Sequence, residues 1–513
     1  MLVRTYSCAL MGVAAIPITI EVNVETGINF FLVGLPDNAV KESQQRIDTA
    51  LKSCGFKIPG KKIVINMAPA DIRKEGSAYD LTLAIGILIA SEQIQGASRV
   101  ENYYIMGELS LDGRLQPVRG ALPMAIEAKR QGKRGIILPV QNAREAAIVG
   151  DIEVLGVENI KQVVDFFDQS VPITPTTINT REEFQRSLSE YEFDFSDVKG
   201  QENIKRALEI AAGGGHNAIL IGPPGSGKTM LAKRLPSILP PLTLNEALET
   251  TKIHSVAGKM SRYASLISIR PFRSPHHTIS DVALVGGGTH PQPGEISLAH
   301  NGVLFLDELP EFKRTVLEVM RQPLEERKVT ISRSKYSVDF PASFMFIAAM
   351  NPCPCGHYNH PKIECTCGQG VVQRYLNKVS GPLMDRIDIH VEVIPVSHEE
   401  LVSSRKIERS EEIRKRVIAT RMIQKERFKN HPGIFCNAQM SNRMVQQFCE
   451  ISSEGQKRLK LAMEKLGLSA RAFDRILKVA RTIADLDESF DIEMDHLSEA
   501  IHFRSLDRDN WGR

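Results

Sequence analysis

Apolar residues occupy every second position of a short stretch near the N-terminus. They are Ile16, Ile18, Ile20, Val22 and Val24. Because successive side chains of a strand point to opposite faces, this alternation predicts a β-strand with one buried face. Residues 62–66 and 135–138 also read as strands, and residues 79–92 and 120–132 read as helices. Residues 1–168 are therefore expected to form an α/β domain.

The middle of the chain holds three short, continuous apolar runs, at Ala218–Ile221, Val303–Leu306 and 344–349. Strands of a parallel sheet are covered on both faces, so they read as continuous apolar runs. Helical patterns lie between the three runs. Residues 191–396 are therefore expected to form a second α/β domain, built on a parallel sheet.

The remaining chain, residues 397–513, reads as helical throughout, with candidate helices at 406–429, 454–466 and 470–486. We expect a C-terminal α-helical domain there. The stretch 169–190 contains two prolines and four threonines and has little apolar periodicity. This composition is typical of a linker between the first domain and the rest.

A phosphate-binding loop is predicted directly after the strand Ala218–Ile221, where a glycine-rich segment opens a helical stretch. In such a loop the backbone N–H groups surround phosphate oxygens, the lysine reaches the β- and γ-phosphates, and the threonine hydroxyl ligates Mg²⁺. The alternative, a chance glycine turn, lacks this strand and helix context. The predicted nucleotide-binding residues are Gly222, Pro223, Pro224, Gly225, Ser226, Gly227, Lys228 and Thr229.

Two further polar groups follow the other apolar runs. Asp307 and Glu308 end the strand Val303–Leu306, so they should lie beside the loop at the carboxyl edge of the sheet. Asp307 is predicted to hold Mg²⁺ through water, and Glu308 to polarise the attacking water. Asn351 follows the third run and could orient that water or sense the γ-phosphate; the alternative is that it simply forms a turn with Pro352. The alternative for the pair of acids is a site that binds ATP without hydrolysing it.

Composition changes this picture little. The formal net charge of +3 is close to neutral, so charge balance alone does not indicate a nucleic-acid-binding protein. The longest apolar run, residues 81–90, is about half the length that a bilayer requires. Because the N-terminal alternation begins inside the region that could be mistaken for a signal peptide, we expect a cytoplasmic protein with no membrane association.

Half of the eight cysteines fall within fifteen residues, at Cys353, Cys355, Cys365 and Cys367. In a reducing compartment such a cluster indicates metal binding before disulfide formation. Four thiolates would form a closed, structural Zn²⁺ site, with His357 or His360 as possible replacements for one ligand. The Cys-x-Cys spacing is tighter than usual, and unliganded thiols are the alternative.

The chain resembles the ComM/YifB family of magnesium-chelatase-like AAA+ ATPases. The resemblance is carried by the segments 198–201, 215–217, 270–278 and 293–302, by Gly381-Pro-Leu-Met-Asp-Arg-Ile-Asp388, and by Leu468-Ser-Ala-Arg-Ala472. It implies that Arg386 is an arginine finger reaching a neighbouring subunit's γ-phosphate, and that Arg471 is a second sensor on the helical lid. The alternatives are an ion pair of Arg386 with Asp385 or Asp388, and a solvated Arg471. Because the finger acts in trans, the family implies a homo-hexamer.

The resemblance also implies elements that face a central pore. Residues 329–338 alternate like a hairpin, with Arg333 and Lys335 near the tip, and residues 286–293 look like a second loop. Basic residues repeated around a ring would give a DNA-binding channel that net charge does not reveal. A solvated hairpin is the alternative.

Residues 1–168 resemble the Lon protease/S5-like fold, through the segments 73–80 and 107–118. Lon enzymes need a serine and a lysine. The nucleophile position falls on Ala78 and the lysine position on Met124, so no proteolysis is expected. Ser77 with Lys74 remains as an alternative dyad.

The sequence thus predicts a Mg²⁺-dependent ATPase, with ATP and Mg²⁺ as cofactors, acting as a hexameric motor on single-stranded or branched DNA. The family implies branch migration in recombination and natural transformation. An ATP-driven remodeller of a protein partner, of the magnesium-chelatase type, is the alternative.

Overall fold

The computed structural model describes residues 1–187, 191–260, 265–288, 291–333, 336–358, 362–396 and 407–504. The chain divides into two compact units, one made of residues 1–188 and 244–268 and the other of 189–243 and 269–513. Residues 244–268 fall inside the segment 191–396 that the sequence assigns to the ATPase domain, yet they pack with the N-terminal unit. The stretch predicted as a linker holds a helix, α8 (Thr180–Ser187), and its residues 188–190 lie outside the described part.

The N-terminal unit is built on a mixed seven-stranded sheet. Its strands lie in the order β3 (Phe30–Val33), β4 (Lys62–Ala68), β2 (Ala14–Glu25), β1 (Leu2–Met11), β5 (Tyr103–Ile105), β8 (Gly135–Pro139) and β9 (Glu153–Val157). β1 pairs with β2 antiparallel from Leu2 opposite Asn23 to Met11 opposite Ala14. β1, β5, β8 and β9 are mutually parallel. The strands predicted at residues 16–24, 62–66 and 135–138 are confirmed.

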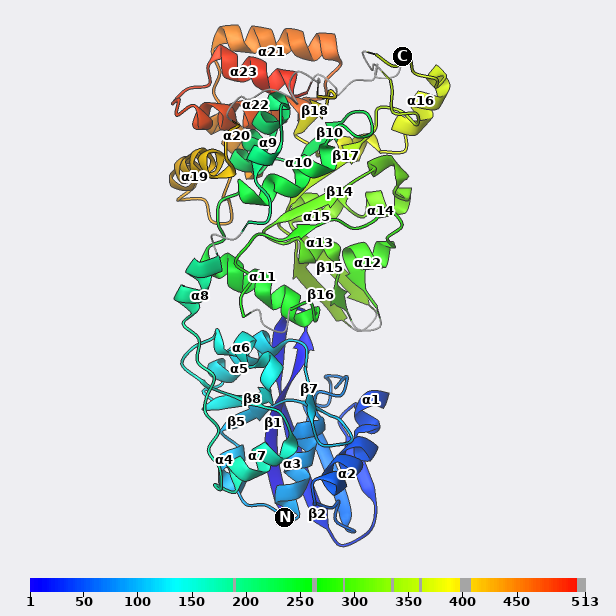
Figure 1. Cartoon of the computed structure of the whole chain (residues 1–513), viewed down its shortest axis with the longest axis vertical. Coiled ribbons are helices and arrows are strands. Elements are labelled where there is room, and N and C mark those ends of the chain that lie inside the picture. Colours follow the sequence, from blue (N-terminus) through cyan, green and yellow to red (C-terminus); the bar gives the residue numbers. More distant parts are fainter. Residues whose placement is uncertain are drawn as a thin grey trace. The chain divides into compact units, whose positions relative to one another are not determined.

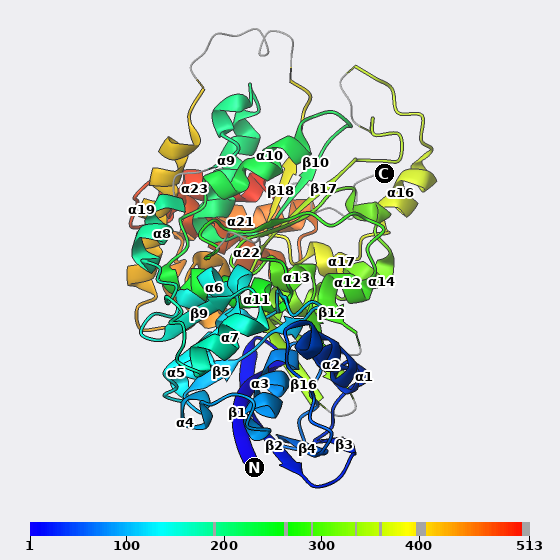
Figure 2. The same ribbon diagram turned by 60° about the horizontal axis from the view of Figure 1, so that its bottom comes forward.

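The helices of this unit are α1 (Asn38–Lys41), α2 (Ser43–Ser53), α3 (Asp80–Ala90), α4 (Ala97–Val100), α5 (Ala121–Arg130), α6 (Val140–Ala147), α7 (Ile160–Phe167), α8 and α11 (Leu244–Val256), and a short ribbon joins β6 (Glu108–Leu109) to β7 (Leu115–Gln116). Every residue of α3 is buried. Figure 2 shows α3 lying along β1, and α3 packs against both β1 and β2. The apolar run 81–90 is therefore a core helix, which explains its apolar character.

α11 docks on the start of α5 through the backbone and on α6 through one buried carboxyl group. Ser255 accepts a hydrogen bond from the N–H of Gly120 at 3.1 Å, and its hydroxyl donates to Glu145. Burial raises the pKa of Glu145. A buried carboxyl group is costly unless it has hydrogen-bond partners, and α11 supplies one of them. The segment 244–268 is therefore part of the N-terminal unit.

The second unit contains a five-stranded, parallel sheet in the order β11 (Phe272–Arg273), β14 (Val303–Leu306), β17 (Met345–Met350), β10 (Ala218–Ile221) and β18 (Ile389–Glu392). Every residue of β10, β14 and β17 is buried, as their continuous apolar sequences predict. Its helices are α9 (Glu202–Gly214), α10 (Lys228–Arg234), α12 (Asp281–Val285), α13 (Glu295–Leu298), α14 (Arg314–Glu318), α15 (Arg321–Glu326), α16 (Gln369–Leu376) and α17 (Gly381–Met384).

The C-terminal part of this unit is helical, as predicted. Its helices are α19 (Ser410–Arg427), α20 (Asn442–Phe448), α21 (Ser453–Leu466), α22 (Ala470–Leu486) and α23 (Met494–His502). Figure 1 shows these helices grouped beside α9, and the buried residues of α9, α19 and α22 share one apolar core with the sheet. The Ser469 side chain accepts a hydrogen bond from the N–H of Ala472, which caps the start of α22.

Two β-hairpins leave the parallel sheet. β15 (Lys328–Arg333) pairs with β16 (Tyr336–Pro341), which confirms the hairpin expected at 329–338. Lys335 lies outside the described residues, and the side chain of Arg333 is likewise not described. β12 (Gly286–Gly287) pairs with β13 (Gln292–Pro293) in the second predicted loop. Among the described helices, none is both long and apolar enough to cross a bilayer.

Candidate nucleotide and metal sites

The glycine-rich loop lies between β10 and α10, and its glycines are required by the backbone. Gly225 and Gly227 adopt φ angles of 74° and 87°, which disfavour residues with a Cβ atom. At Gly222 an added Cβ would lie 2.3 Å from the carbonyl oxygen of Val393. The loop is thus folded tightly enough for its N–H groups to face a bound anion.

Lys228 is buried at the centre of this loop. Its Nζ donates to the carbonyl oxygens of Gly222 at 2.7 Å and Pro223 at 2.8 Å, and lies 3.3 Å from Oδ1 of Asn351. Burial lowers the pKa of Lys228, while the charges of Asp307 and Glu308 oppose that shift. The ammonium group is therefore held where phosphate oxygens could replace the carbonyl groups as acceptors.

The two acidic residues meet the loop as their position in the sequence predicts. Thr229 Oγ1 donates to Asp307 Oδ2 at 2.5 Å, so the two predicted Mg²⁺ ligands are in direct contact. Glu308 adopts a left-handed conformation with φ of 52°, and its side chain is 58% exposed. β14 and β10 both neighbour β17, which places Asp307, Asn351 and the loop at the same edge of the sheet.

His277 is a further member of this site. Its Nδ1 lies 3.4 Å from Oε2 of Glu308, and its ring packs edge-on to Phe312. The sequence does not predict this contact. His277 lies in the Pro-His-His-Thr segment at 275–278, and the spacing of that segment does not indicate a partner 31 residues away.

Arg386 and Arg471 lie apart from the phosphate loop, in that no hydrogen bond or ion pair among the described residues joins them to it. Arg386 is only 7% exposed; it pairs with Glu325 and donates to the carbonyl oxygen of Pro382. Its Nε is buried and has no hydrogen-bond partner among the residues that the structure describes. Arg471 is 68% exposed and lies 3.7 Å from Asp385. Glu325, rather than Asp385 or Asp388, is thus the intrachain partner of Arg386.

A buried polar network connects the sheet to the helical part of the unit. His216, just before β10, lies 3.3 Å from Asp388 through Nδ1 and 2.8 Å from the Thr482 hydroxyl through Nε2. Arg475 of α22 pairs with the same aspartate. Although burial alone would raise the pKa of Asp388, Arg475 and His216 hold it well below its usual range. The network fixes α22 against the strand that carries the phosphate loop.

We expect the free energy of unfolding to decrease in mild acid because two histidines are buried. Burial lowers the pKa of His216 below its ordinary value of 6.5, and that of His390, beside Arg504, well below it. The unfolded chain therefore binds protons near pH 6.5 that the folded chain does not. The free energy of unfolding should be insensitive to these groups above about pH 7. Below about pH 6.5 it should fall by about 1.4 kcal/mol per histidine for each pH unit, until the pH reaches the folded-state pKa of that histidine.

This slope can be measured by urea denaturation followed by circular dichroism between pH 7.5 and 5.5. His390→Gln should reduce this slope by the contribution of one proton. His276→Gln, at an exposed position, should leave the slope unchanged. An unfolding free energy that does not fall across this range would show that the buried imidazoles are already protonated in the folded chain.

The four clustered cysteines come together as predicted. Their Sγ atoms all lie within 4.8 Å of one another. Cys353 lies 3.3 Å from Cys355 and 3.7 Å from Cys365. Burial alone would raise the pKa of Cys355. Hydrogen bonds, including those from the backbone N–H groups of His357 and Thr366, outweigh burial and lower the pKa to about 5. Four thiol groups at this spacing suit a tetrahedral metal ion. His360 lies outside the described residues.

The Lon-like unit lacks a dyad at the expected positions. Ala78 and Met124 both pack in one apolar cluster, so neither a hydroxyl nor an amine is present there. The alternative dyad is not formed, because the Ser77 hydroxyl donates to Glu108 and Lys74 Nζ donates to the carbonyl oxygen of Pro69. Burial lowers the pKa of Lys74.

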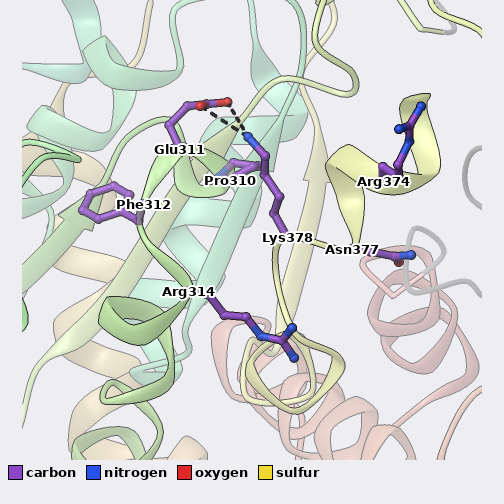
Figure 3. Close-up of a pocket in the computed structure, with 7 residues that line it drawn as sticks. All are labelled: Pro310, Glu311, Phe312, Arg314, Arg374, Asn377 and Lys378. Carbon is purple, nitrogen blue, oxygen red and sulfur yellow. Dashed lines mark hydrogen bonds and ion pairs between the residues drawn. The ribbon is translucent and has the colours of Figure 1, made fainter. Parts of the chain in front are cut away.

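An open pocket of about 440 Å³ lies close to the acidic end of β14. Figure 3 shows the residues that line this pocket. They come from the turn η3 (Leu309–Glu311), which follows Glu308 directly, and the residues after it, and from the end of α16 and the residues after it. Lys378 Nζ lies 3.4 Å from both carboxylate oxygens of Glu311 across the pocket. Arg314 and Arg374 also line this pocket, which is therefore basic on balance.

Comparison with known families and proteins covers nearly the whole chain. The model described as "Magnesium chelatase, subunit ChlI" matches residues 194–401, "Subunit ChlI of Mg-chelatase" matches 20–142, and "Magnesium chelatase, subunit ChlI C-terminal" matches 407–504. The competence protein ComM of Haemophilus influenzae is 44% identical over 506 residues, 98% of this chain and 97% of that protein. The protein YifB of Salmonella typhimurium is 44% identical over 512 residues, 98% and 96% of the two chains.

A shorter match supports the fold of the N-terminal unit. Lon protease 2 of Bacillus subtilis is 30% identical over 128 residues, 24% of this chain and 22% of that protein. The architecture is thus a Lon-like N-terminal domain, a P-loop α/β domain with a parallel sheet, and a C-terminal helical domain. On these matches and this geometry, the chain belongs to the ComM/YifB family of magnesium-chelatase-like AAA+ ATPases.

Proposed function

We propose that this protein is a Mg²⁺-dependent ATPase that works as a homo-hexameric motor on branched or single-stranded DNA. The observation that carries the ATPase part is the contact of Thr229 with Asp307, beside a buried Lys228 that also touches Asn351. A P-loop, an acidic strand end and a polar amide at one sheet edge form the arrangement that phosphoryl transfer from ATP to water requires.

Each residue has a distinct role in this proposal. The loop 222–229 binds the phosphates through its N–H groups, and Lys228 neutralises charge on the β- and γ-phosphates. Thr229 and Asp307 would hold Mg²⁺, which supplies charge neutralisation between those phosphates. Glu308 accepts the proton of the attacking water, and Asn351 orients that water.

The two arginines act at the boundary between subunits. Arg386 reaches the γ-phosphate of a neighbouring subunit, and Arg471 on the helical lid senses the nucleotide of its own subunit. The buried and unpartnered Nε of Arg386 supports a role beyond an intrachain ion pair, because such groups are costly to leave unpaired.

DNA is proposed as the substrate because a relative that is 44% identical over nearly its whole length is named a competence protein. We expect the hairpin of β15 and β16, with Arg333 and Lys335, to contact DNA in the centre of the ring. Phosphate contacts of this kind make binding strongly salt-dependent.

Forked or four-way DNA should stimulate ATP hydrolysis several-fold, and the stimulation should decrease as the salt concentration rises. The measurement compares steady-state ATPase rates with and without each DNA, at 50 and 200 mM salt. Arg333→Ala together with Lys335→Ala should abolish the stimulation while leaving the basal rate intact. Equal rates with and without every DNA would contradict the motor proposal.

In that event the alternative function is an ATP-driven remodeller of a protein partner. It is favoured by the chelatase subunit models, which match all three segments of the chain. Capture of a protein partner by the ATP-bound Glu308→Gln variant would then identify the substrate.

The remaining roles follow the chemistry of the side chains. The four clustered cysteines are proposed to hold a structural Zn²⁺ ion. None of the eight cysteines, all of which lie in the described part of the chain, forms a disulfide; this suits a reducing compartment, so we place the protein in the cytoplasm. The Lon-like domain is proposed to be non-proteolytic, because Ala78 and Met124 stand at the dyad positions.

A further inference from the structure

The cysteine-bearing loop that follows β17 packs directly against the phosphate loop. Gly356 adopts φ of 83°, and a Cβ atom added there would lie 2.4 Å from Cδ of Pro224. Pro224 is one of the residues that shape the phosphate loop. The two loops therefore approach so closely that even one methyl group would push them apart.

One end of the cysteine loop is attached to a residue of the candidate nucleotide site, and the other end leads into α16. At one end, Asn351 contacts Lys228 and precedes Cys353 by only two residues. At the other end, α16 begins two residues after Cys367. The cysteine loop is thus joined directly to a predicted catalytic residue, Asn351.

The helix α16 returns to the same site through two side chains. Burial raises the pKa of the Tyr375 hydroxyl, and the nearby backbone of Asn351 partly opposes that shift. Just beyond α16, Lys378 pairs with Glu311 of η3, the turn that follows Glu308 (Figure 3). Loop and helix together thus contact the phosphate loop, Asn351 and the turn after Glu308.

The cysteine loop lacks regular secondary structure wherever the structure describes it, since the described residues of 351–368 contain no helix or strand. Its described residues from 362 to 368 are all exposed or half-buried, so no apolar core fixes this part. The four thiols, three of them half-buried, are the groups placed to cross-link it. A metal ion bound by the four thiolates would cross-link the two halves of this loop.

We propose that a zinc ion on Cys353, Cys355, Cys365 and Cys367 is a positioning element of the ATPase site. When bound, the ion holds the cysteine loop against Pro224 and keeps Asn351 beside Lys228. When the ion is lost, the loop relaxes and ATP turnover slows. This inference rests on the proposed ATPase activity, and it makes that activity dependent on the metal content of the chain.

The first test removes the metal. Cys365→Ser in the full-length protein should lose about one zinc per chain by elemental analysis, and its basal kcat without DNA should fall about 10- to 100-fold, since a displacement near 1 Å can cost that much. Nucleotide affinity should change less than kcat. The control is Cys54→Ser, a half-buried thiol of the N-terminal unit, which should retain both zinc and rate. Zinc added back to chelated wild-type protein should restore kcat.

The second test separates the contact from the metal. Gly356→Ala keeps all four thiols, so the variant should retain zinc yet lose kcat, because its methyl group collides with Pro224. Gly368→Ala is the matched control, since φ there is −65° and an added Cβ meets nothing within 4 Å.

The outcomes distinguish the parts of the proposal. Wild-type protein without zinc would overturn the metal assignment. A Cys365→Ser variant that lacks zinc but hydrolyses ATP at the wild-type rate would overturn the coupling and leave only a structural metal. Zinc-loaded wild-type protein that binds but never hydrolyses ATP would instead refute the ATPase function, and the coupling would then be supported or overturned by nucleotide affinity in the same variants.

Discussion

Replacing Glu308 by glutamine should lower kcat for ATP hydrolysis about 10²- to 10³-fold, because a neutral amide cannot accept the proton of the attacking water. ATP binding should persist, since the contacts of Lys228, Thr229 and Asp307 do not involve the Glu308 side chain. The carboxylate is 58% exposed and is held at the end of β14 by a left-handed backbone conformation. It is thus available to a water molecule at the sheet edge.

The measurement is kcat in single- and multiple-turnover assays, with nucleotide affinity measured on the same protein. Glu326→Gln is a matched control, because it removes an exposed carboxylate of α15 and should leave the rate unchanged. Asp307→Asn should differ from Glu308→Gln by weakening Mg²⁺-dependent nucleotide binding. If Glu308→Gln hydrolyses ATP near the wild-type rate, Glu308 is not the general base.

The convergence of the candidate nucleotide-site residues could be predicted from the sequence because each of them follows a short apolar strand. Parallel strands end at the same edge, so Lys228, Asp307 and Asn351 had to meet once β10, β14 and β17 were recognised as neighbours. The cysteine cluster was equally local, since four thiols within fifteen residues need only one loop to converge.

Contacts between distant segments could not be predicted in the same way. The pairing of Arg386 with Glu325 spans 61 residues and depends on how α15 and α17 pack. The His216–Asp388 contact spans 172 residues. No periodicity in 244–268 indicates that this stretch packs with the N-terminal unit, because the buried face of a helix does not identify its partner.

Replacing Arg386 by alanine should reduce ATP turnover at least 10³-fold, since an arginine finger typically contributes a factor of 10³–10⁵. Within one chain, however, Arg386 is buried and paired with Glu325, so a structural role would also impair the protein. Glu325→Gln separates the two roles. Loss of a structural ion pair would impair Glu325→Gln as it does Arg386→Ala, whereas a finger should keep its rate when its intrachain partner is neutralised.

Mixing two inactive variants gives the decisive measurement. If Arg386 acts in trans, an Arg386→Ala subunit still carries Glu308, and a Glu308→Gln neighbour still supplies Arg386. A random one-to-one mixture in a closed ring should then recover about a quarter of the wild-type sites, because each requirement is met about half the time. The double variant mixed with either single variant should recover nothing. If co-assembled mixtures recover no activity, Arg386 acts only on the nucleotide bound by its own subunit. ATP hydrolysis would then not require a ring, and DNA binding would be the remaining reason for one.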